Sequence, residues 1–136
     1  MNDCIFCKFV SKDIPTAMIY EDTDVYAFLD NQPLNIGHTL VIPKGNYANI
    51  YETPDEILAK MIIVAKKIAK KQKELLGAEG VNIHMNNDKS AGQSVFHSHM
   101  HVVPRYSNDG YKEWTRSIHT EEEILSAQDA LKNSLL

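Results

Sequence analysis

The sequence predicts an α+β domain in which an antiparallel sheet of five strands packs on one long helix. Three observations predict it: short apolar runs bounded by turn residues, one longer run with helical spacing, and short connections between them. The chain has 136 residues, of which 43% are hydrophobic and 24% are charged. That length is enough to bury a core, so we expect one domain spanning 1–136.

The first three strands are expected at 17–22, 24–30 and 38–44, which read AMIYED, DVYAFLD and HTLVIPK. The segment NQPLNIG between the last two is rich in Asn, Pro and Gly and is typical of a turn. A meander of neighbouring strands is the simplest connection.

A long helix is expected next, because Thr53 has the residue type of an N-cap, Pro54 suits the first helical position and Glu56 completes a capping box. Gly77 stands where the helix should end. Five apolar residues with helical spacing predict the buried face: Ile57, Met61, Ala65, Ile68 and Leu75. Six lysines elsewhere around the axis predict a solvated face: Lys60, Lys66, Lys67, Lys70, Lys71 and Lys73.

The last two strands are expected at 80–87 and 95–105, with the flexible loop DKSAGQS between them. A C-terminal helix is expected at 120–136. His84 is expected to point away from Asn86, toward packing or solvent.

The overall charge and hydropathy limit which classes of partner the protein is expected to bind. A formal net charge of -4 gives no global attraction to nucleic acid, although a local pocket can still bind a phosphate. No apolar run reaches the ~20 residues that span a bilayer, and the N-terminus lacks a signal-peptide pattern. We therefore expect a cytoplasmic protein whose partners include neither a nucleic-acid polymer nor a membrane.

The motif HSHMHVVPR places His97, His99 and His101 at alternate positions. Alternate side chains of a strand share one face, so all three are expected to point the same way. The imidazoles can react themselves or hold a metal ion. Alternate residues lie roughly 6.5 to 7 Å apart along a strand, so three would need very different directions to meet one zinc ion. A zinc ion on the triad is therefore kept as an alternative.

The loop SAGQS precedes the three histidines. Gly92 permits unusual backbone angles, while Gln93 and Ser94 offer hydrogen-bond donors. Donors that converge beside imidazoles predict a cradle for a phosphate oxygen.

The stretch AGQSVFHSHMHVV resembles the histidine-triad (HIT) nucleotide-binding proteins, in particular their Hint-like branch. The segments CIFCKFVSKDIPTAMIYEDTDVYAFLD, GHTLVIPK and NIHMNN resemble that family in order and spacing. The resemblance implies a HIT-like fold and a homodimer in which two sheets join. It also implies an enzyme that hydrolyses or transfers nucleoside monophosphate groups from phosphoramidates, adenylates or dinucleoside polyphosphates.

By the same resemblance, His99 attacks the α-phosphorus and carries the nucleotidyl group, and no cofactor is required for the chemistry. His97 and His101 would donate to phosphate oxygens or to the leaving group. The resemblance adds the phosphate-end residues His38, Asn86, Gln93 and Ser94. The nucleoside end would be formed by Ile5, Phe6, Phe28, Asp30 and Asn31, with the Asp30 carboxylate for the ribose hydroxyls.

The pair Cys4 and Cys7 has a spacing used in metal and redox sites. Similar pairs in this branch bind a structural zinc ion together with the first triad histidine, here His97, and a histidine that follows Ile-Pro-Lys. Asn46 stands at that last position, and an amide oxygen is a poor ligand in a tetrahedral site. Zinc on the three remaining ligands, two reduced thiols and a redox pair all stay open.

The leading hypothesis is a dimeric HIT-family hydrolase that acts on purine nucleoside phosphoramidates or related nucleotides through a nucleotidyl intermediate on His99. The alternatives are a nucleotide-binding regulatory protein with incidental hydrolysis, a dinucleoside polyphosphate hydrolase, and a metal-dependent hydrolase. Which flanking histidine protonates the leaving group is left open.

Overall fold

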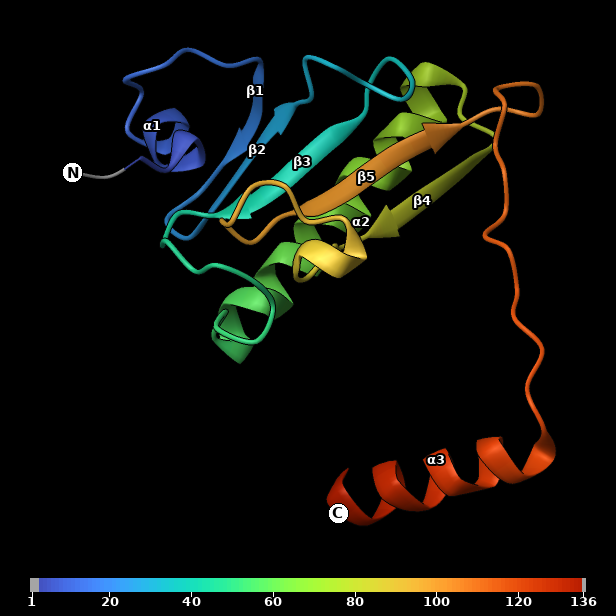
Figure 1. Cartoon of the computed structure of the whole chain (residues 1–136). Helices are drawn as coiled ribbons and strands as arrows, with labels where there is room; N and C mark the ends of the chain where they lie inside the picture. Colours follow the sequence, from blue (N-terminus) through green and yellow to red (C-terminus); the bar gives the residue numbers. More distant parts are fainter. Residues whose placement is uncertain (1–2, 136) are drawn as a thin grey trace.

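A computed structural model describes residues 3–135 of the chain, and Figure 1 shows how its elements are arranged. In chain order the elements are α1 Ile5–Val10, β1 Met18–Glu21, β2 Val25–Leu29, β3 Thr39–Pro43, α2 Asp55–Leu76, β4 Gly80–His84, the 3-10 turn η1 Lys89–Ala91, β5 Met100–Arg105 and α3 Glu121–Leu135. The five strands form one sheet in the order β1-β2-β3-β5-β4, and every neighbouring pair is antiparallel. The predicted α+β class is therefore confirmed.

Helix α2 covers one face of the sheet (Figure 1). Alternate strand residues such as Val41 and Val102 point to this face and pack against Met61 and Val64 of the helix. The central strands β2 and β3 are buried almost throughout, which explains why they read as continuous apolar runs.

A second, smaller cluster lies on the other face of the sheet. It consists of Phe6 from α1 with Tyr26, Phe28, Leu40 and Ile42 from β2 and β3. These strand residues alternate with those that face α2. Since β5 pairs Leu40 with His101, that histidine belongs to the face covered by α1.

The start of α2 differs from the prediction. The helix begins at Asp55, and its N-cap Pro54 makes no side-chain cap. The Thr53 hydroxyl instead donates to the Asn49 carbonyl at 2.8 Å, so the predicted capping box is wrong. The predicted end is confirmed, because Gly77 adopts a left-handed φ of 69° there.

The predicted buried face of α2 is wrong at its last member. Leu75 is 75% exposed, whereas Gln72 is buried and its amide donates to the carbonyls of Gly37 and Val102. A buried glutamine gives no apolar signal, so spacing alone could not find it.

Helix α1 was not expected. Six residues offer too few turns for a clear period, and its N-cap is Cys4, whose sulfur accepts from the Cys7 amide at 3.2 Å. The helix is held by its contacts with the sheet rather than by its own length.

The expected strand at 95–105 begins only at Met100. The segment before it is irregular, and the Ser98 amide donates to the Tyr47 carbonyl at 2.6 Å. The prediction that the three triad histidines share one strand face is therefore wrong.

The chain beyond Arg105 leaves the sheet as an extended segment and ends in α3, which stands apart from the sheet (Figure 1). The C-terminal helix is thus confirmed. Every described residue of α3 is exposed, including the apolar side chains of Ile124, Leu125, Leu131 and Leu135.

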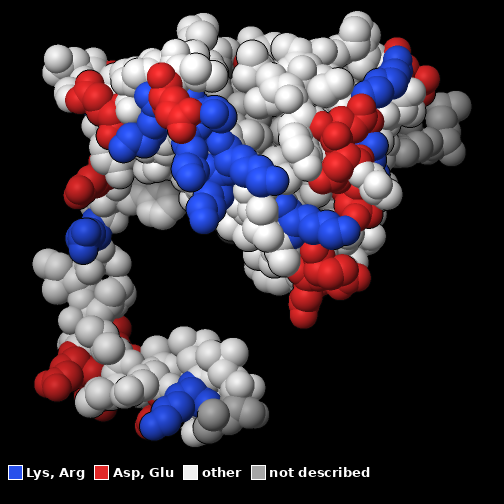
Figure 2. Space-filling view, turned by 180° about the vertical axis from the view of Figure 1, so that it is seen from behind, with Lys and Arg blue, Asp and Glu red and all other residues white. Residues whose placement is uncertain are grey.

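All six lysines singled out on α2 are exposed, as predicted. Seen from behind, Lys and Arg form a band with Asp and Glu beside it (Figure 2). Lys71 pairs with Glu74 at 2.9 Å, so part of this charge is neutralised locally. Among residues 3–135, no helix combines the length and apolar character that a membrane crossing requires.

Candidate active site

His99 is buried, with 6% of its surface exposed. Its ring meets the ring of Phe6 edge-on, with 5.2 Å between the ring centroids. Its Nδ1 lies 2.7 Å from the carbonyl oxygen of His97. Because a carbonyl only accepts, Nδ1 carries the proton and Nε2 keeps its lone pair. Burial lowers the pKa of His99, which favours this neutral form. A neutral ring with one available nitrogen is what a nucleophile requires.

His38 and His101 form a hydrogen-bonded pair whose proton positions can be assigned. The Leu34 amide donates to Nδ1 of His38 at 3.1 Å, so the proton of His38 is on Nε2. That Nε2 donates to Nδ1 of His101 at 2.9 Å. The proton of His101 is therefore on Nε2, the nitrogen opposite its contact with His38.

Burial, followed by the charges of His99, His84 and His38, lowers the pKa of His101 to about 3. Burial also lowers the pKa of His38, and the nearby Asp30 carboxylate opposes this. Both rings are thus neutral near pH 7. His101 is left with one N–H that can donate to a bound group.

The His97 side chain lies among the cysteines and the Pro43 carbonyl rather than beside His38 and His101. Its ring is fully buried, its Nε2 donates to the Pro43 carbonyl at 2.8 Å, and its Nδ1 lies 3.1 Å from Cys4 Sγ and 3.5 Å from Cys7 Sγ. Both nitrogens are engaged, so the expectation that His97 contacts the substrate is not met. The three triad rings also do not converge on one point, which counts against the metal-triad alternative.

The Cys4–Cys7–His97 group has the features of a three-ligand zinc site. Its ligand atoms lie within 4.8 Å of one another. The second nitrogen of His97 donates to a carbonyl, as metal-bound histidines commonly do. Burial raises the pKa of Cys4, and bound zinc would oppose this because it binds the thiolate. Asn46, which stands where the family resemblance would place a fourth ligand, is exposed.

A cavity of about 850 Å³ opens beside His99 and His101. It is lined by all five residues expected at the nucleoside end, Ile5, Phe6, Phe28, Asp30 and Asn31, and by Ser94, which was expected at the phosphate end. Sequence reasoning missed several more: Phe9, Ile14, Pro15, Thr16, Ala17, Leu29, Gln32, Leu40 and Val95. The spacing of Phe6 and Phe9 was a local signal that could have found Phe9, because both lie on α1.

Asp30 stands at the edge of this cavity. Its Oδ1 accepts from the Gln32 amide at 2.9 Å, while its Oδ2 lies 3.8 Å from Nε2 of His38. The carboxylate is held in place by its turn and remains partly exposed, so it can accept further hydrogen bonds.

Gln93 and Ser94 have different positions. The Gln93 amide nitrogen donates to the carbonyls of Ala48 and Val95, and its oxygen accepts from the Asp88 amide. Gln93 therefore holds the loop together, whereas Ser94 is exposed and lines the cavity.

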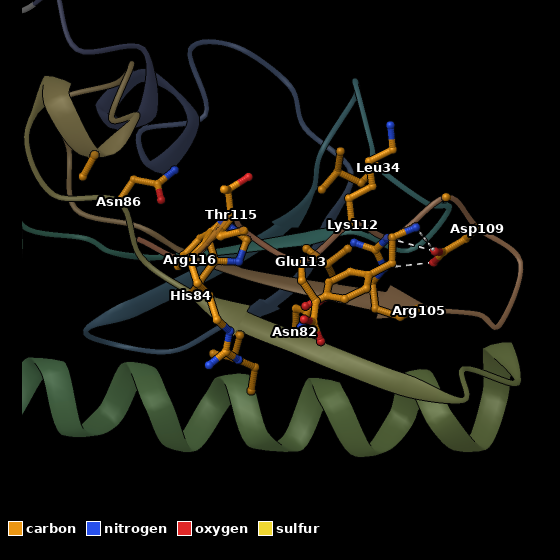
Figure 3. Close-up of a pocket in the computed structure, with 16 residues that line it drawn as sticks. Leu34, Asn82, His84, Asn86, Arg105, Asp109, Lys112, Glu113, Thr115 and Arg116 are labelled. Carbon is orange, nitrogen blue, oxygen red and sulfur yellow. Dashed lines mark hydrogen bonds and ion pairs between the residues drawn. The ribbon is translucent and has the colours of Figure 1, made fainter. Parts of the chain in front are cut away.

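A second cavity, of about 1040 Å³, lies between β4 and the segment that follows β5 (Figure 3). His84 and Asn86 line it from one side, and an ion pair of Arg105 with Asp109, at 2.9 Å, lies at its other end. The expectation that His84 faces away is wrong. His84 is paired with His101 across the β4–β5 ladder, so the two side chains share one face.

The chain matches the HIT domain family over residues 11–108. It is 47% identical over 111 residues to Protein hit of Bacillus subtilis, covering 81% of this chain and 77% of that protein. It is 38% identical over 108 residues to adenylylsulfatase HINT3 of Arabidopsis thaliana, covering 79% of this chain and 55% of that one. The chain belongs to the HIT domain family, whose nucleotide-binding proteins and hydrolases form one superfamily.

Solved structures agree. A HIT family protein from Bacillus anthracis is 39% identical, with a TM-score of 0.89 over 98% of this chain and 97% of that one. A zinc-bound histidine triad protein from Mycobacterium smegmatis is 42% identical, with a TM-score of 0.78 over 98% of each chain. A histidine triad nucleotide-binding protein from Candida albicans is 31% identical, with a TM-score of 0.86 over 98% of this chain and 97% of that one.

Proposed function

We propose that the protein is a nucleotide hydrolase that cleaves purine nucleoside phosphoramidates or related nucleotides at the α-phosphate through a nucleotidyl intermediate on His99. The observation that carries the proposal is the neutral His99 ring, whose Nδ1–H is held by the His97 carbonyl beside an apolar cavity. Nucleophilic catalysis needs an available lone pair whose ring is held in one tautomer.

In the first step, Nε2 of His99 attacks the α-phosphorus and the bond from phosphorus to the leaving nitrogen breaks. The phosphorylated ring becomes a cation, and the His97 carbonyl stabilises its Nδ1–H. The leaving nitrogen takes one proton from water and departs as a neutral amine. The Nε2–H of the neutral His101 ring donates a hydrogen bond to the electron pair that this nitrogen gains as its bond to phosphorus breaks.

In the second step, a water molecule attacks the phosphorus and the bond to His99 Nε2 breaks. The attacking water releases one proton to solvent, which balances the proton taken up in the first step, and His99 returns to its neutral form. His38 supports both steps because its hydrogen bond fixes one nitrogen of His101. His97 then has a structural role rather than a role in proton transfer.

The nucleoside would occupy the cavity of about 850 Å³. The rings of Phe6 and Phe28 meet at 5.6 Å and supply an apolar wall for a flat base. Asp30 offers oxygens for the ribose hydroxyls, and Ser94 and Asn31 lie at the same rim. Asn86 would contact the phosphate from the side of the second cavity.

The proposal extends to the assembly and the metal. A homodimer is supported by the exposed apolar side chains of α3 and by β4, which is an edge of the sheet. A structural zinc ion on Cys4, Cys7 and His97 would tie α1 to the triad segment, and so hold Phe6 beside His99, without taking part in the reaction.

Hydrolysis of adenosine 5′-phosphoramidate by the purified protein tests the proposal. We expect turnover that survives a strong chelator and falls at least about a thousandfold in His99→Ala. A matched control is His119→Ala, which removes an exposed histidine that lines neither cavity. Turnover abolished by the chelator in a protein that stays folded, or full activity in His99→Ala, would contradict it.

A further inference from the structure

The histidine cluster has a member outside the triad motif. His84 of β4 lies directly across the ladder from His101 of β5. Their rings are nearly parallel, with an angle of 10° and 4.5 Å between centroids. This is the closest ring contact that His101 makes, since His99 and His38 lie 5.1 and 5.2 Å away.

The contacts of His101 restrict different movements of its ring. The hydrogen bond from His38 fixes Nδ1 but leaves the ring able to tilt about that contact. A flat ring stacked on one face opposes such a tilt, because aromatic pairs in contact lose dispersion energy when they separate. The edge of His99 meets His101 at a steeper angle of 62° and cannot replace this contact.

The stack also joins the two cavities. His101 lines the cavity proposed for the nucleoside, and His84 lines the neighbouring cavity together with Asn86 (Figure 3). The α-phosphate would lie at His99 and His101, so a group that leaves it can depart toward the side where His84 stands.

We infer that His84 is a positioning residue, which by stacking on His101 holds the Nε2–H of that ring toward the group that leaves the phosphate. The inference rests on the proposed function and adds a residue to it.

The chemistry of His84 fits this role. Burial, followed by the charge of His99, lowers the pKa of His84, so its ring is neutral near pH 7, as the ring of His101 is, and the two rings stack without charge repulsion. The flat aromatic shape of His84, rather than its charge, then holds the His101 ring. An aromatic substitute should therefore keep the function, and an aliphatic one should lose it.

Two variants and two substrates test the inference. His84→Leu removes the flat ring, and His84→Phe keeps it without the nitrogens. The substrates are adenosine 5′-phosphoramidate, whose leaving nitrogen needs a proton, and the p-nitrophenyl ester of AMP, whose leaving group departs as a stable anion. A misplaced hydrogen-bond donor slows mainly the first reaction, because the amine gathers the released electron pair on its nitrogen, whereas p-nitrophenolate spreads it over the ring.

We expect His84→Leu to lower kcat for the phosphoramidate about tenfold, which is the scale of one weakened hydrogen bond, and kcat for the ester less than about twofold. His84→Phe should retain both values within about twofold. A nitrogen NMR spectrum of histidine-labelled protein should show His101 protonated on Nε2 in the wild type and in His84→Phe. In His84→Leu that signal should broaden or average.

Equal losses on the two substrates, no loss in His84→Leu, or an equally large loss in His84→Phe would overturn the inference. The unfolding temperature of each variant shows whether a loss reflects folding, and the NMR spectrum reports on His101 without any turnover. His99→Ala separates the two levels: if it stays active, the proposed function fails, whereas an unaffected His84→Leu in a His99-dependent enzyme removes only the role of His84.

Discussion

At the scale of single residues, hydrogen bonds to backbone groups decide what each histidine can do. A carbonyl holds the proton of His99 on Nδ1, and an amide holds the proton of His38 on Nε2. His97 donates to another carbonyl and turns its second nitrogen to the cysteines. The backbone groups around His99, His38 and His97 therefore give each of these histidines a different role.

The buried histidines predict how stability changes with pH. Burial lowers the pKa of His38 and His101 below the unfolded value of about 6.5, so the unfolded state binds more protons below that pH. The free energy of unfolding should therefore fall as the pH drops from 7 toward 5, a window that lies above the titration of ordinary carboxylates.

Urea unfolding across this window measures the effect, and His38→Gln, which keeps an amide donor for His101, is the matched variant. The slope of stability against pH should be shallower in the variant. A flat profile from pH 7 to 5 in the wild type would contradict the predicted burial of neutral rings.

At the scale of elements, α2 and α1 hold the two faces of the sheet. Met61 of α2 is completely buried against the strands, while Ile63 on the same helix is 53% exposed. Met61→Ala should lower the free energy of unfolding by about 2–5 kcal/mol, and Ile63→Ala by less than about 1 kcal/mol. Chemical denaturation of both variants checks this. Similar losses in the two would show that this face of α2 does not carry the core.

Much of the fold could be predicted from the sequence because its signals are local. The apolar runs of β2 and β3 and the Gly77 helix end depend on nearby residues and appear as expected. Helix α1 and the buried Gln72 depend on contacts with the sheet, and no local pattern carries that information.

The candidate site likewise has residues that the sequence could predict and residues whose positions depend on tertiary contacts. The lining positions of Phe6, Phe28 and Asp30 followed from the family resemblance, and the structure brings them to one cavity. The place of His97 with the cysteines and the stack of His84 on His101 depend on tertiary packing and strand register. A residue two positions from Asn86 shares its face on a regular strand, and this signal for His84 was available in the sequence.

At the scale of the whole molecule, the segment after β5 together with α3, here called the C-terminal arm, leaves apolar side chains exposed in a single chain. Helix α3 exposes an apolar face, and Trp114 in the segment before it is 89% exposed. Exposed apolar surfaces of this kind commonly mark an interaction site. We therefore expect the proposed homodimer to bury this arm against a second copy of the chain.

Light scattering of the full chain at micromolar concentration should give the mass of a dimer. The double variant Ile124→Asp, Leu131→Asp places charges on the apolar face of α3 and should shift the mass toward that of a monomer, because unpaired charges in an interface core are costly. Lys132→Asp, an exposed charged position of the same helix, is the control. A wild-type monomer, or a double variant that dimerises as well as the wild type, would count against this assembly.

The central claim is that the nucleotidyl group is carried on His99. Rapid quenching of the protein with adenosine 5′-phosphoramidate, followed by mass spectrometry of the intact chain and its peptides, tests it most directly. The account predicts an AMP adduct on the peptide that contains His99, formed and lost at rates compatible with turnover and absent in His99→Ala. An active enzyme with no adduct at any time, or an adduct on another residue that turns over at the same rate, would contradict it.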